Sequence, residues 1–450
     1  MERIYQSNDM ILLLDNYLPE SRSLHESFEK AGYDCPVVVI NDDGFLPENA
    51  ISAYGFFLGD FQHAPNGLGR PRYFNEIKVL DYWEISGNNK GGKVSDLSRE
   101  RGKIFYAEPL HKRLVKVVDW YDERGVVRSS DHYNRYGAIY ARTVFNAKGQ
   151  RVNKSYFSAG GQEIIVENYV TGDIILNDGE EVKFFRTKTD FVLYLFTKAG
   201  FRQSRIFYNS LSTPFLVSQK LTAAEKRDVL FWQERSRDDI PGNMQIIFSG
   251  QASRTAKVMV QNRRAYDKLA ALGANKDMMR KLGFIYSFEK ENHGQRKALI
   301  CTNSDNIEQC ETIVARLPEM HFYIAALTEM SPKLLKMEAY DNVSLYPNVK
   351  MDILDGLFLA CDYYFDINHS IEIVSAVRRA FLHNHLIFAF RETAHNLDYV
   401  ADEHIYAAAD ADAMLADVKA VLDEACLLKE HVKKQHRAAL AEKADAYLQF

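Results

Sequence analysis

Short apolar runs that alternate with amphipathic segments mark the beginning of the chain. Residues 11–14 and 37–40 are entirely apolar, which is typical of strands buried on both faces. Between them, Ser23 and Glu26 have the spacing of a capping box, and Gly32 is suited to end the helix that follows. The pattern predicts the strand–helix–strand start of an α/β domain.

The same alternation returns after residue 200 and continues towards the C-terminus. Strands are predicted at residues 204–207, 230–232, 245–248, 257–260, 298–301, 322–326, 343–345, 363–367 and 386–390. Helices are predicted at residues 222–229, 262–272, 307–317, 351–359 and 371–382. Repeated β–α units of this size favour parallel, doubly wound sheets.

The last part of the chain carries one apolar stripe. Residues 411–447 contain neither glycine nor proline, and their apolar positions recur every three or four residues. This predicts a single long C-terminal helix. A coiled-coil dimer helix would show the same stripe, but because the stripe is short, we favour packing against the chain's own α/β domains.

The middle of the chain has a different sequence pattern. From about residue 70 to residue 200, runs rich in Tyr, Phe, Val and Ile are separated by turn-forming stretches, as in an antiparallel meander. A helix over residues 190–200 would return the chain to the α/β fold. The predicted organisation is a first Rossmann-like domain (residues 1–65 and 201–282), an inserted β-meander (66–200), a second Rossmann-like domain (283–410) and a C-terminal helix (411–450).

Composition narrows the class of protein. The 450 residues are 46% hydrophobic and 26% charged, with a net charge of -5, which favours globular domains and gives no overall attraction to nucleic acid. The sequence shows no secretory signal and no apolar run long enough to span a bilayer, so a cytoplasmic location is expected. Aromatic residues make up 12%, and many lie in the meander. Because only one face of a meander can cover its own domain, we expect rings on the other face to contact a partner.

Familiar chemical motifs are missing. There is no Walker A motif, no G-x-G-x-x-G opening a helix, no G-x-S-x-G and no H-E-x-x-H. The five cysteines are scattered and never form a C-x-x-C pair, which argues against a disulfide framework or a zinc site. We therefore predict no cofactor and no metal, and the motifs name no catalytic residue.

Several longer stretches resemble the GtfB family, whose members are stabilising, acceptor-recognising subunits of a bacterial O-linked N-acetylglucosaminyltransferase complex of the accessory Sec system. The resemblance covers nearly the whole chain. It rests on residues 43–47 (DGFLP), 71–76 (PRYFNE), 117–120 (VVDW), 130–137 (SDHYNRYG), 166–168 (VEN), 171–177 (TGDIILN), 209–211 (NSL), 231–234 (FWQE) and 240–244 (IPGNM).

This resemblance implies a glycosyltransferase architecture of the GT-B kind, with two Rossmann-like domains. It implies that the meander associates with the catalytic subunit GtfA, and that the cleft between the α/β domains binds a serine-rich repeat adhesin. It also implies that the subunit itself transfers no sugar and acts in the cytoplasm, or at the inner face of the membrane through the complex.

The residues support the loss of sugar transfer. Active relatives carry two acidic residues eight positions apart near a helix start, whereas Ala380 lies eight residues after Glu372 and Tyr364 eight before it. The basic pair expected near residue 284 is reduced to Lys290. A diphosphate needs several cationic or N–H partners to offset its desolvation, so we expect donor binding to be lost or very weak.

Two other functions stay open on the sequence. An active GT-B enzyme with a divergent UDP-sugar site would use Glu372, Lys290 and His369 as its donor contacts. A pure assembly scaffold would leave the acceptor to the partner subunit.

Residue chemistry suggests two sets of contacts. Hydroxyl-rich polypeptide favours amides, carboxylates and aromatic rims, so the predicted acceptor-binding residues are Trp232, Glu234, Asp239, Asn243 and Asn209. Large aromatics and arginine are common interface anchors, so the predicted partner contacts are Tyr133, Arg135, Tyr136 and Trp120. Each segment also has a plainer interpretation, as a polar connection or as a strand with one wet face.

Overall fold

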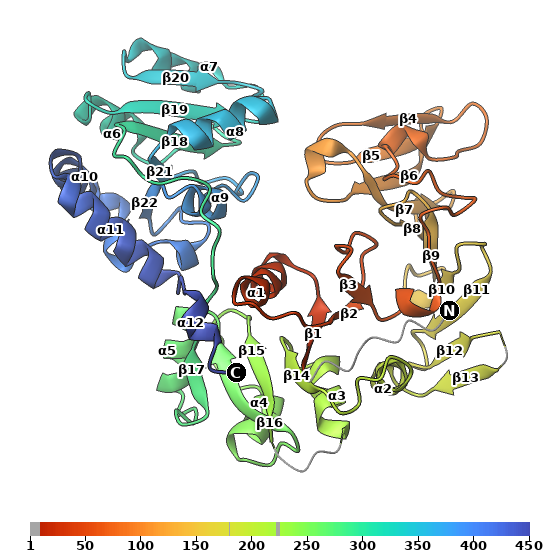
Figure 1. The fold of residues 1–450 in the computed structure, drawn as a ribbon. Coiled ribbons are helices and arrows are strands. Elements are labelled where there is room, and N and C mark those ends of the chain that lie inside the picture. Colours follow the sequence, from red (N-terminus) through yellow and green to blue (C-terminus); the bar gives the residue numbers. More distant parts are fainter. Residues whose placement is uncertain (1–9, 180, 222–225) are drawn as a thin grey trace.

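The computed structural model describes residues 10–179, 181–221 and 226–450 and contains three sheets. Two parallel sheets form separate α/β domains, and an antiparallel sheet extends from the first of them (Figure 1). The predicted fold class, two doubly wound domains with an inserted meander, is confirmed.

The first domain has a seven-stranded parallel sheet of order β17-β16-β15-β14-β1-β2-β3. Its strands are β1 (Met10–Asn16), β2 (Val37–Asn41), β3 (Ala50–Ser52), β14 (Arg205–Tyr208), β15 (Asp228–Trp232), β16 (Thr255–Val260) and β17 (Met279–Lys281). Its helices are α1 (Pro19–Lys30), α3 (Thr213–Lys220), α4 (Gly242–Phe248) and α5 (Arg263–Ala271). Strand order reverses between β1 and β14, which is where such sheets bind ligands.

The meander is a ten-stranded antiparallel sheet whose strands follow one another in chain order from β4 to β13. They are β4 (Glu84–Gly87), β5 (Gly92–Asp96), β6 (Arg99–Tyr106), β7 (Val115–Tyr121), β8 (Val127–Tyr133), β9 (Ile139–Phe145), β10 (Arg151–Phe157), β11 (Glu163–Asn168), β12 (Ile174–Asn177) and β13 (Val182–Phe185). Helix α2 (Lys188–Lys198) then leads back to the first domain.

The two ends of this sheet bury opposite faces. Near the first domain, Ala141, Tyr156 and Ile165 are cross-strand neighbours on one face and belong to that domain's core. Towards the far end, Ile104 and Val118 lie on the other face and form a small separate core. At each end of the sheet, the face opposite the buried one therefore takes no part in the core.

The second domain has a six-stranded parallel sheet of order β20-β19-β18-β21-β22-β23. Its strands are β18 (Lys297–Thr302), β19 (His321–Ala326), β20 (Val343–Tyr346), β21 (Tyr363–Asp366), β22 (Leu386–Phe390) and β23 (Ile405–Tyr406). Its helices are α6 (Cys310–Arg316), α7 (Pro332–Leu335), α8 (Met351–Ala360) and α9 (Ala376–Leu382), followed by α10 (Ala411–Asp423), α11 (Ala425–Ala438) and α12 (Ala444–Tyr447).

Some local predictions are wrong. The proposed strand at residues 245–248 is part of helix α4, which begins just after Pro241, a residue suited to a helix start. Helix α1 starts at Pro19, so Ser23 lies inside it and is not its cap. The proposed helix at 222–229 lies partly outside the described residues, and its last two residues belong to strand β15.

The C-terminal region is also not one helix. It breaks at Glu424, whose backbone is extended, and again after Ala438. The apolar stripe predicted from periodicity is real, since Met414, Val418 and Val421 are buried in the second-domain core. Periodicity alone did not reveal the breaks because Glu424 is neither glycine nor proline.

The chain crosses between the α/β domains twice at one place. Gly283 packs so closely on the second crossing that a Cβ atom there would lie 1.8 Å from the carbonyl oxygen of Leu440. The Phe284 N–H donates to Leu440 O (3.1 Å), and the Glu442 N–H donates to Phe284 O (2.9 Å). Helix α12 then packs on the first domain, where the buried Tyr447 hydroxyl donates to Gly283 O (2.6 Å).

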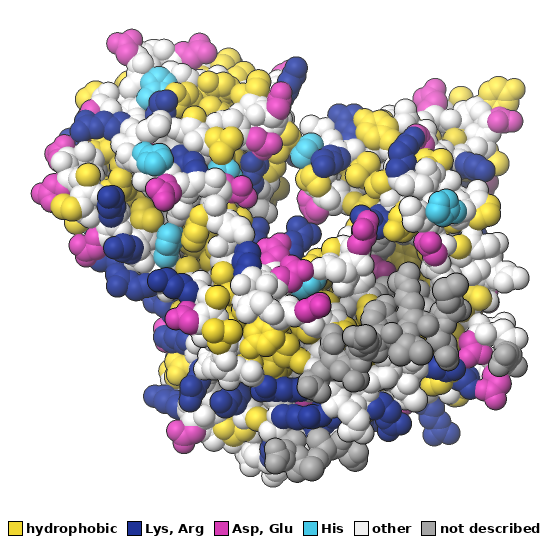
Figure 2. All heavy atoms as spheres, viewed as in Figure 1, with side chains coloured by type: hydrophobic (Ala, Val, Ile, Leu, Met, Phe, Trp, Pro, Cys, Tyr) yellow, Lys and Arg dark blue, Asp and Glu magenta, His cyan; other side chains and the backbone are white. Residues whose placement is uncertain are grey.

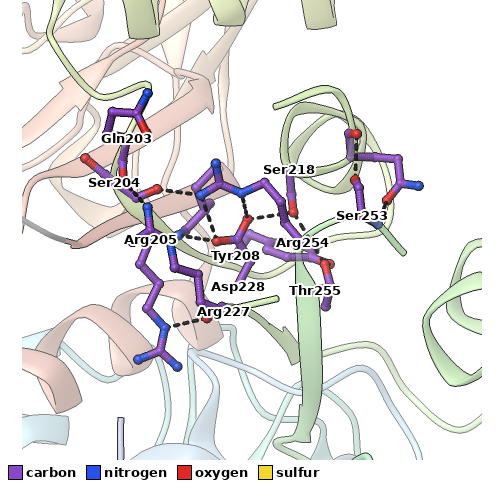
Figure 3. Close-up of polar contacts among 12 residues, drawn as sticks. Gln203, Ser204, Arg205, Tyr208, Ser218, Arg227, Asp228, Ser253, Arg254 and Thr255 are labelled. Carbon is purple, nitrogen blue, oxygen red and sulfur yellow. Dashed lines mark hydrogen bonds and ion pairs between the residues drawn. The ribbon is translucent and has the colours of Figure 1, made fainter. Parts of the chain in front are cut away.

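A fully buried ion pair fixes the amino edge of the first sheet (Figure 3). Arg254 Nε lies 2.8 Å from Asp228 Oδ2, and its Nη2 donates to Ser204 O (2.6 Å). The Asp228 carboxylate also accepts the Ile206 N–H (2.9 Å) and the Ser218 hydroxyl (2.8 Å). The pair therefore ties together β14, β15, α3 and the segment leading into β16.

Breaking this pair should destabilise the protein strongly. Arg254→Met leaves a buried carboxylate without its cation, which should lower the free energy of unfolding by about 3–5 kcal/mol. Urea denaturation measures this change in the free energy of unfolding, from the first unfolding transition. Arg237→Met, which removes an exposed ion pair, is the control and should change stability by less than about 1 kcal/mol. Equal effects of the two substitutions would contradict the prediction.

Candidate functional site

A row of hydrogen-bonded side chains follows the carboxyl edge of the first sheet. We call it the amide belt and define it as Asn41, Asp15, Asn209, Gln233 and Gln261, which come from the ends of β2, β1, β14, β15 and β16 or the residue just after them. Because the carboxyl ends of parallel strands meet at one edge, residues far apart in sequence become neighbours there.

The belt is continuous. Asn41 Nδ2 donates to Asp15 Oδ1 (2.9 Å), and the Asp15 backbone N–H donates to Asn209 Oδ1 (2.9 Å). Asn209 Nδ2 donates to Gln233 Oε1 (3.0 Å), and Gln233 Nε2 donates to Gln261 Oε1 (2.8 Å). These contacts satisfy amide groups that would otherwise be costly to bury.

One end of the belt reaches the meander. Lys188 Nζ donates to Asn41 Oδ1 (3.1 Å) and lies 3.0 Å from Glu167 of strand β11. Burial raises the pKa of Asp15, although hydrogen bonds from Ser210 and Asn41 and the charge of Lys188 oppose the rise. The belt therefore connects the meander mechanically to the edge of the first domain.

The other end of the belt opens into a polar pocket between the two α/β domains. The pocket has room of about 80 Å³ for water-sized molecules, and its lining includes Glu20, Arg235, Gln261, Tyr286 and Asp398. Arg263 and Arg264, which also line it, are both paired across the domains with Asp402 (2.8 and 3.0 Å). The lining thus combines amides, acids and bases, with its aromatic rings largely buried.

The five predicted acceptor-binding residues occupy different environments. Asn209 belongs to the belt, and Asn243 lies nearby, where its Nδ2 donates to Leu211 O (2.9 Å). Glu234 and Asp239 are exposed and pair with Arg237 (3.6 and 3.2 Å). Trp232 is only 2% exposed and packs in the first-domain core.

Sequence reasoning did not single out the two belt glutamines that line the pocket. Gln233 lies in a stretch that the sequence marked, but as the neighbour of residues named for their aromatic ring or charge. Gln261 follows strand β16 without any motif around it. Only the spatial order of the strands brings the two together.

The second domain has a matching switch point between β18 and β21, but its crevice is bridged. The Glu308 N–H donates to Ile367 O (2.8 Å), and the His369 N–H donates to Asn306 O (3.1 Å). Side chains reinforce the bridge, with His369 Nε2 2.6 Å from Glu308 Oε2. The loops after the two strands thus satisfy each other where a donor nucleotide would bind in an active relative.

Charged groups beside this crevice are also paired within the chain. His395 Nδ1 lies 2.5 Å from the buried Asp366 carboxylate, whose hydrogen bond raises the pKa of His395 to about 9. The Glu372 carboxylate accepts the Val377 N–H (2.8 Å) at the start of α9, while burial raises the pKa of Glu372. The charged groups of His395 and Glu372 thus already have hydrogen-bond partners within the chain.

Lys290 is not near this crevice. Its ammonium group binds Asp362 Oδ1 (2.5 Å) and Cys361 O (2.6 Å), just before the amino end of β21. A donor site that groups Lys290 with Glu372 and His369 is therefore wrong, because the carboxyl and amino ends of a strand lie at opposite edges of the sheet.

Two of the predicted partner contacts, Arg135 and Tyr136, attach the meander to the first domain, whereas Tyr133 packs in the small separate core of the sheet. Tyr133 is only 4% exposed, and the Arg72 guanidinium lies 5.8 Å from its ring centroid. The Arg135 side chain donates to Leu46 O (3.1 Å) and lies 5.8 Å over the Tyr136 ring. The fourth, Trp120, donates from Nε1 to Asp131 Oδ2 (2.9 Å) within the sheet.

Trp120 packs against the small far-end core. Beyond that core, the same sheet face exposes Val144, Ile175, Val182 and Phe184, which the strand registers place on one side, and we call these four residues the open face. Phe184 is 58% and Val182 70% exposed. Figure 2 shows other hydrophobic side chains at the surface of the meander, on the upper right of the molecule.

Two further classes of site find no support in the described part of the chain. It holds no group of three or more His, Cys, Asp or Glu residues placed to bind a metal ion. No helix within residues 10–179, 181–221 and 226–450 has the length and apolarity needed to cross a bilayer.

Comparisons with known proteins agree with this architecture. Family models match at residues 11–57 (GtfB N-terminal domain), 83–186 (GtfB middle domain), 188–272 (GtfB third domain) and 298–435 (GftB/GlyA-F C-terminal domain). Curated relatives are the GtfB stabilising proteins of UDP-N-acetylglucosamine–peptide N-acetylglucosaminyltransferase from Streptococcus gordonii (41% identity, 95% of this chain and 94% of the relative) and Streptococcus agalactiae (44%, 95% and 96%).

Solved structures add the fold. A chain in the crystal structure of a GtfA/B complex bound to UDP and GlcNAc is 40% identical, with a TM-score of 0.91 over 97% of this chain and 98% of that one. TarM, at 11% identity and a TM-score of 0.50 over 98% of each chain, shares the overall GT-B-like fold alone.

The bridged crevice predicts that this chain by itself does not bind UDP-N-acetylglucosamine. The diphosphate would have to displace loop–loop hydrogen bonds without cationic partners to replace them. Titration calorimetry of the purified chain should show no heat of binding at millimolar ligand, with the catalytic partner as positive control. Micromolar binding would contradict the prediction.

Proposed function

Since the chain belongs to the family of GtfB stabilising proteins of UDP-N-acetylglucosamine–peptide N-acetylglucosaminyltransferase, we propose that it is the non-catalytic, acceptor-binding subunit of such a transferase. Its partner is a catalytic subunit of the GtfA kind. Its second ligand is a Ser/Thr-rich polypeptide of the serine-rich repeat adhesin class, modified on the cytoplasmic side of the membrane.

One contrast carries the proposal. The first α/β domain keeps a polar belt that leads into a pocket, whereas the second domain bridges the crevice where a sugar nucleotide would bind. Such a protein can hold an acceptor but cannot position a donor. Because the crevice of the second domain is closed in this chain, the proposed catalytic subunit binds the sugar donor and this chain binds the acceptor.

Association with the catalytic subunit is assigned to the meander. Its open face exposes large apolar side chains on a rigid sheet, which is the kind of surface that partner proteins cover. The arrangement also explains stabilisation, because burying apolar area on both subunits favours the assembled and folded state. Arg135 and Tyr136 hold the meander at its junction with the first domain, whereas Tyr133 and Trp120 stabilise the far-end core of the sheet.

Binding of the acceptor is assigned to the belt and the pocket. An extended polypeptide offers hydroxyl groups and unpaired backbone N–H and C=O groups, which amide side chains recognise well. Asn209 supports the belt, and Asn243, Glu234 and Asp239 lie on the loops beside it. Trp232 acts from beneath, by filling the core.

Replacement of Phe184 by aspartate should weaken association with the catalytic subunit. A buried charge opposite an apolar partner surface is costly, so the affinity should fall at least tenfold. Calorimetry or analytical ultracentrifugation of the mixed subunits measures the change. Leu359→Asp, at a position of similar exposure on helix α8 of the second domain, is the matched control and should bind normally. Unchanged affinity of the Phe184→Asp protein would reject this face as the interface.

Cross-linking distinguishes an acceptor-binding subunit from a pure scaffold. A Ser/Thr-rich peptide carrying a photoreactive group should label this chain in the assembled complex, on segments that line the pocket. An excess of unlabelled peptide should prevent the labelling. Labels confined to the catalytic subunit would favour the scaffold and reject acceptor binding by this chain.

A further inference from the structure

Lysine and arginine gather at the amino edge of the first sheet. Nine Lys or Arg but only two Asp or Glu residues lie in the segments that form this edge at β14, β15, β16 and β17, which are residues 199–205, 226–228, 249–257 and 272–281. Figure 2 shows Lys and Arg side chains in a row along the lower side of the molecule, where Figure 1 places α4 and β16. We call this surface the basic edge and define it as Arg202, Arg205, Arg227, Lys257, Lys276 and Arg280.

The basic edge has no counterions of its own. Asp228, one of the two acids, is already neutralised by the buried Arg254, and Asp277, the other, forms no ion pair with the edge. Within residues 10–179, 181–221 and 226–450, no carboxylate lies at ion-pair distance from any of the six side chains. The cations therefore face solvent with their charge uncompensated.

The fold holds two of these guanidinium groups close together. Arg205 Nε donates to Arg227 O, and Arg227 Nη2 donates to Gln203 O (Figure 3). Burial lowers the pKa of Arg205, and the charge of Arg227 adds to this lowering, while the charge of Asp228 opposes it. Like charges that are kept together without counterions repel each other. An anion at this edge would relieve that repulsion.

Helix ends account for little of this charge. A helix C-terminus favours nearby cations, and α5 ends at this edge, at Ala271. The effect falls off within the last turn of a helix, however. Lys276 lies beyond that turn and Arg280 lies in strand β17, so the dipole of α5 does not explain why they are basic.

The shape of the basic edge indicates the kind of anion. The cations come from the ends of four adjacent strands, which span about 14 Å at about 4.8 Å per strand. One small anion cannot reach along such a row, whereas an extended anionic surface meets all of it. Leu272, at the end of α5, is 38% exposed beside these cations. Apolar side chains among Lys and Arg suit the headgroup region of a bilayer better than the backbone of a nucleic acid.

The position of the basic edge also suits contact with a surface. The carboxyl and amino ends of parallel strands lie at opposite edges of a sheet, so the basic edge is on the far side of the first domain from the pocket. In Figure 1 the second domain lies above the first domain, whereas α4 and β16 lie at its lower side. A bilayer at the basic edge would therefore leave the pocket open.

We propose that the basic edge binds the anionic phospholipid headgroups of a bilayer, so that this chain itself contacts the membrane surface. Each Lys or Arg close to an anionic bilayer strengthens binding about fivefold, and the contact weakens as salt screens the charges. The proposal concerns a surface that neither acceptor binding nor association through the meander uses.

A triple variant, Arg202→Glu, Lys276→Glu and Arg280→Glu, tests the proposal. All three side chains are exposed, and none forms a hydrogen bond or ion pair with another described residue, so the fold should be kept. Flotation of the full chain with vesicles of phosphatidylcholine and phosphatidylglycerol should show binding that the triple variant weakens at least tenfold. Vesicles of phosphatidylcholine alone should bind neither protein, and added salt should weaken binding of the wild type.

A matched triple variant separates the position of the charges from the net charge. Lys333→Glu, Lys336→Glu and Lys419→Glu change exposed side chains of the second domain that form no ion pair with a described residue. This protein has the same net charge as the first triple variant, but its affinity for the vesicles should stay within twofold of wild type. Both variants should keep the thermal unfolding temperature of the wild type and its affinity for the catalytic subunit.

Several results would overturn the proposal. Wild-type protein that binds phosphatidylglycerol vesicles no better than phosphatidylcholine vesicles has no anionic lipid site. Equal loss of binding in the two triple variants would make net charge, and not the basic edge, the cause. Loss of affinity for the catalytic subunit in the first variant alone would make the edge a protein interface. A short DNA duplex that binds as tightly as the vesicles would make it a general site for polyanions.

Discussion

The parallel pairing of β1 with β14 is the constraint on which the rest of the molecule depends. Met10 pairs with Arg205 and Leu13 with Tyr208, so the chain leaves the sheet after its edge strand β3, forms the meander and returns beside β1 as β14. The pairing brings Asp15 and Asn209 within one hydrogen bond of each other at the carboxyl edge. At the amino edge, Asp228 secures β14 through the Ile206 N–H. Fold, insertion and amide belt all follow from this one junction.

The two α/β domains have crevices at equivalent places, but one is open and the other is bridged. In the first, side-chain amides at the strand ends bond to one another in a row and leave a polar pocket beside them. In the second, backbone groups of the two loops bond directly across the switch point. A bridge made of backbone is hard to reverse by single substitutions, since no one side chain holds it. The loss of donor binding that we propose would thus rest on loop geometry as much as on missing acidic residues.

Much of the architecture was predictable because fully buried strands have a strong signature. The apolar runs at 11–14, 37–40 and 386–390 each became a buried strand, and regular turn spacing revealed the meander. Apolar runs too short to separate helix from strand were less reliable, as at 245–248. The site was harder, since residue type does not reveal orientation. Trp232 looked like a rim residue and is core, whereas the belt glutamines become visible only once strand order is known.

The double crossing beside Gly283 has a consequence for motion. Two chain segments that share backbone hydrogen bonds resist twisting more than a single tether does, and they leave bending as the softer movement. Substitution of Gly283 would push the two crossings apart, because a Cβ atom has no room against Leu440. Pocket residues of the second domain therefore move as one body. Release of the proposed acceptor would then depend on bending at this one junction, because both domains line the pocket.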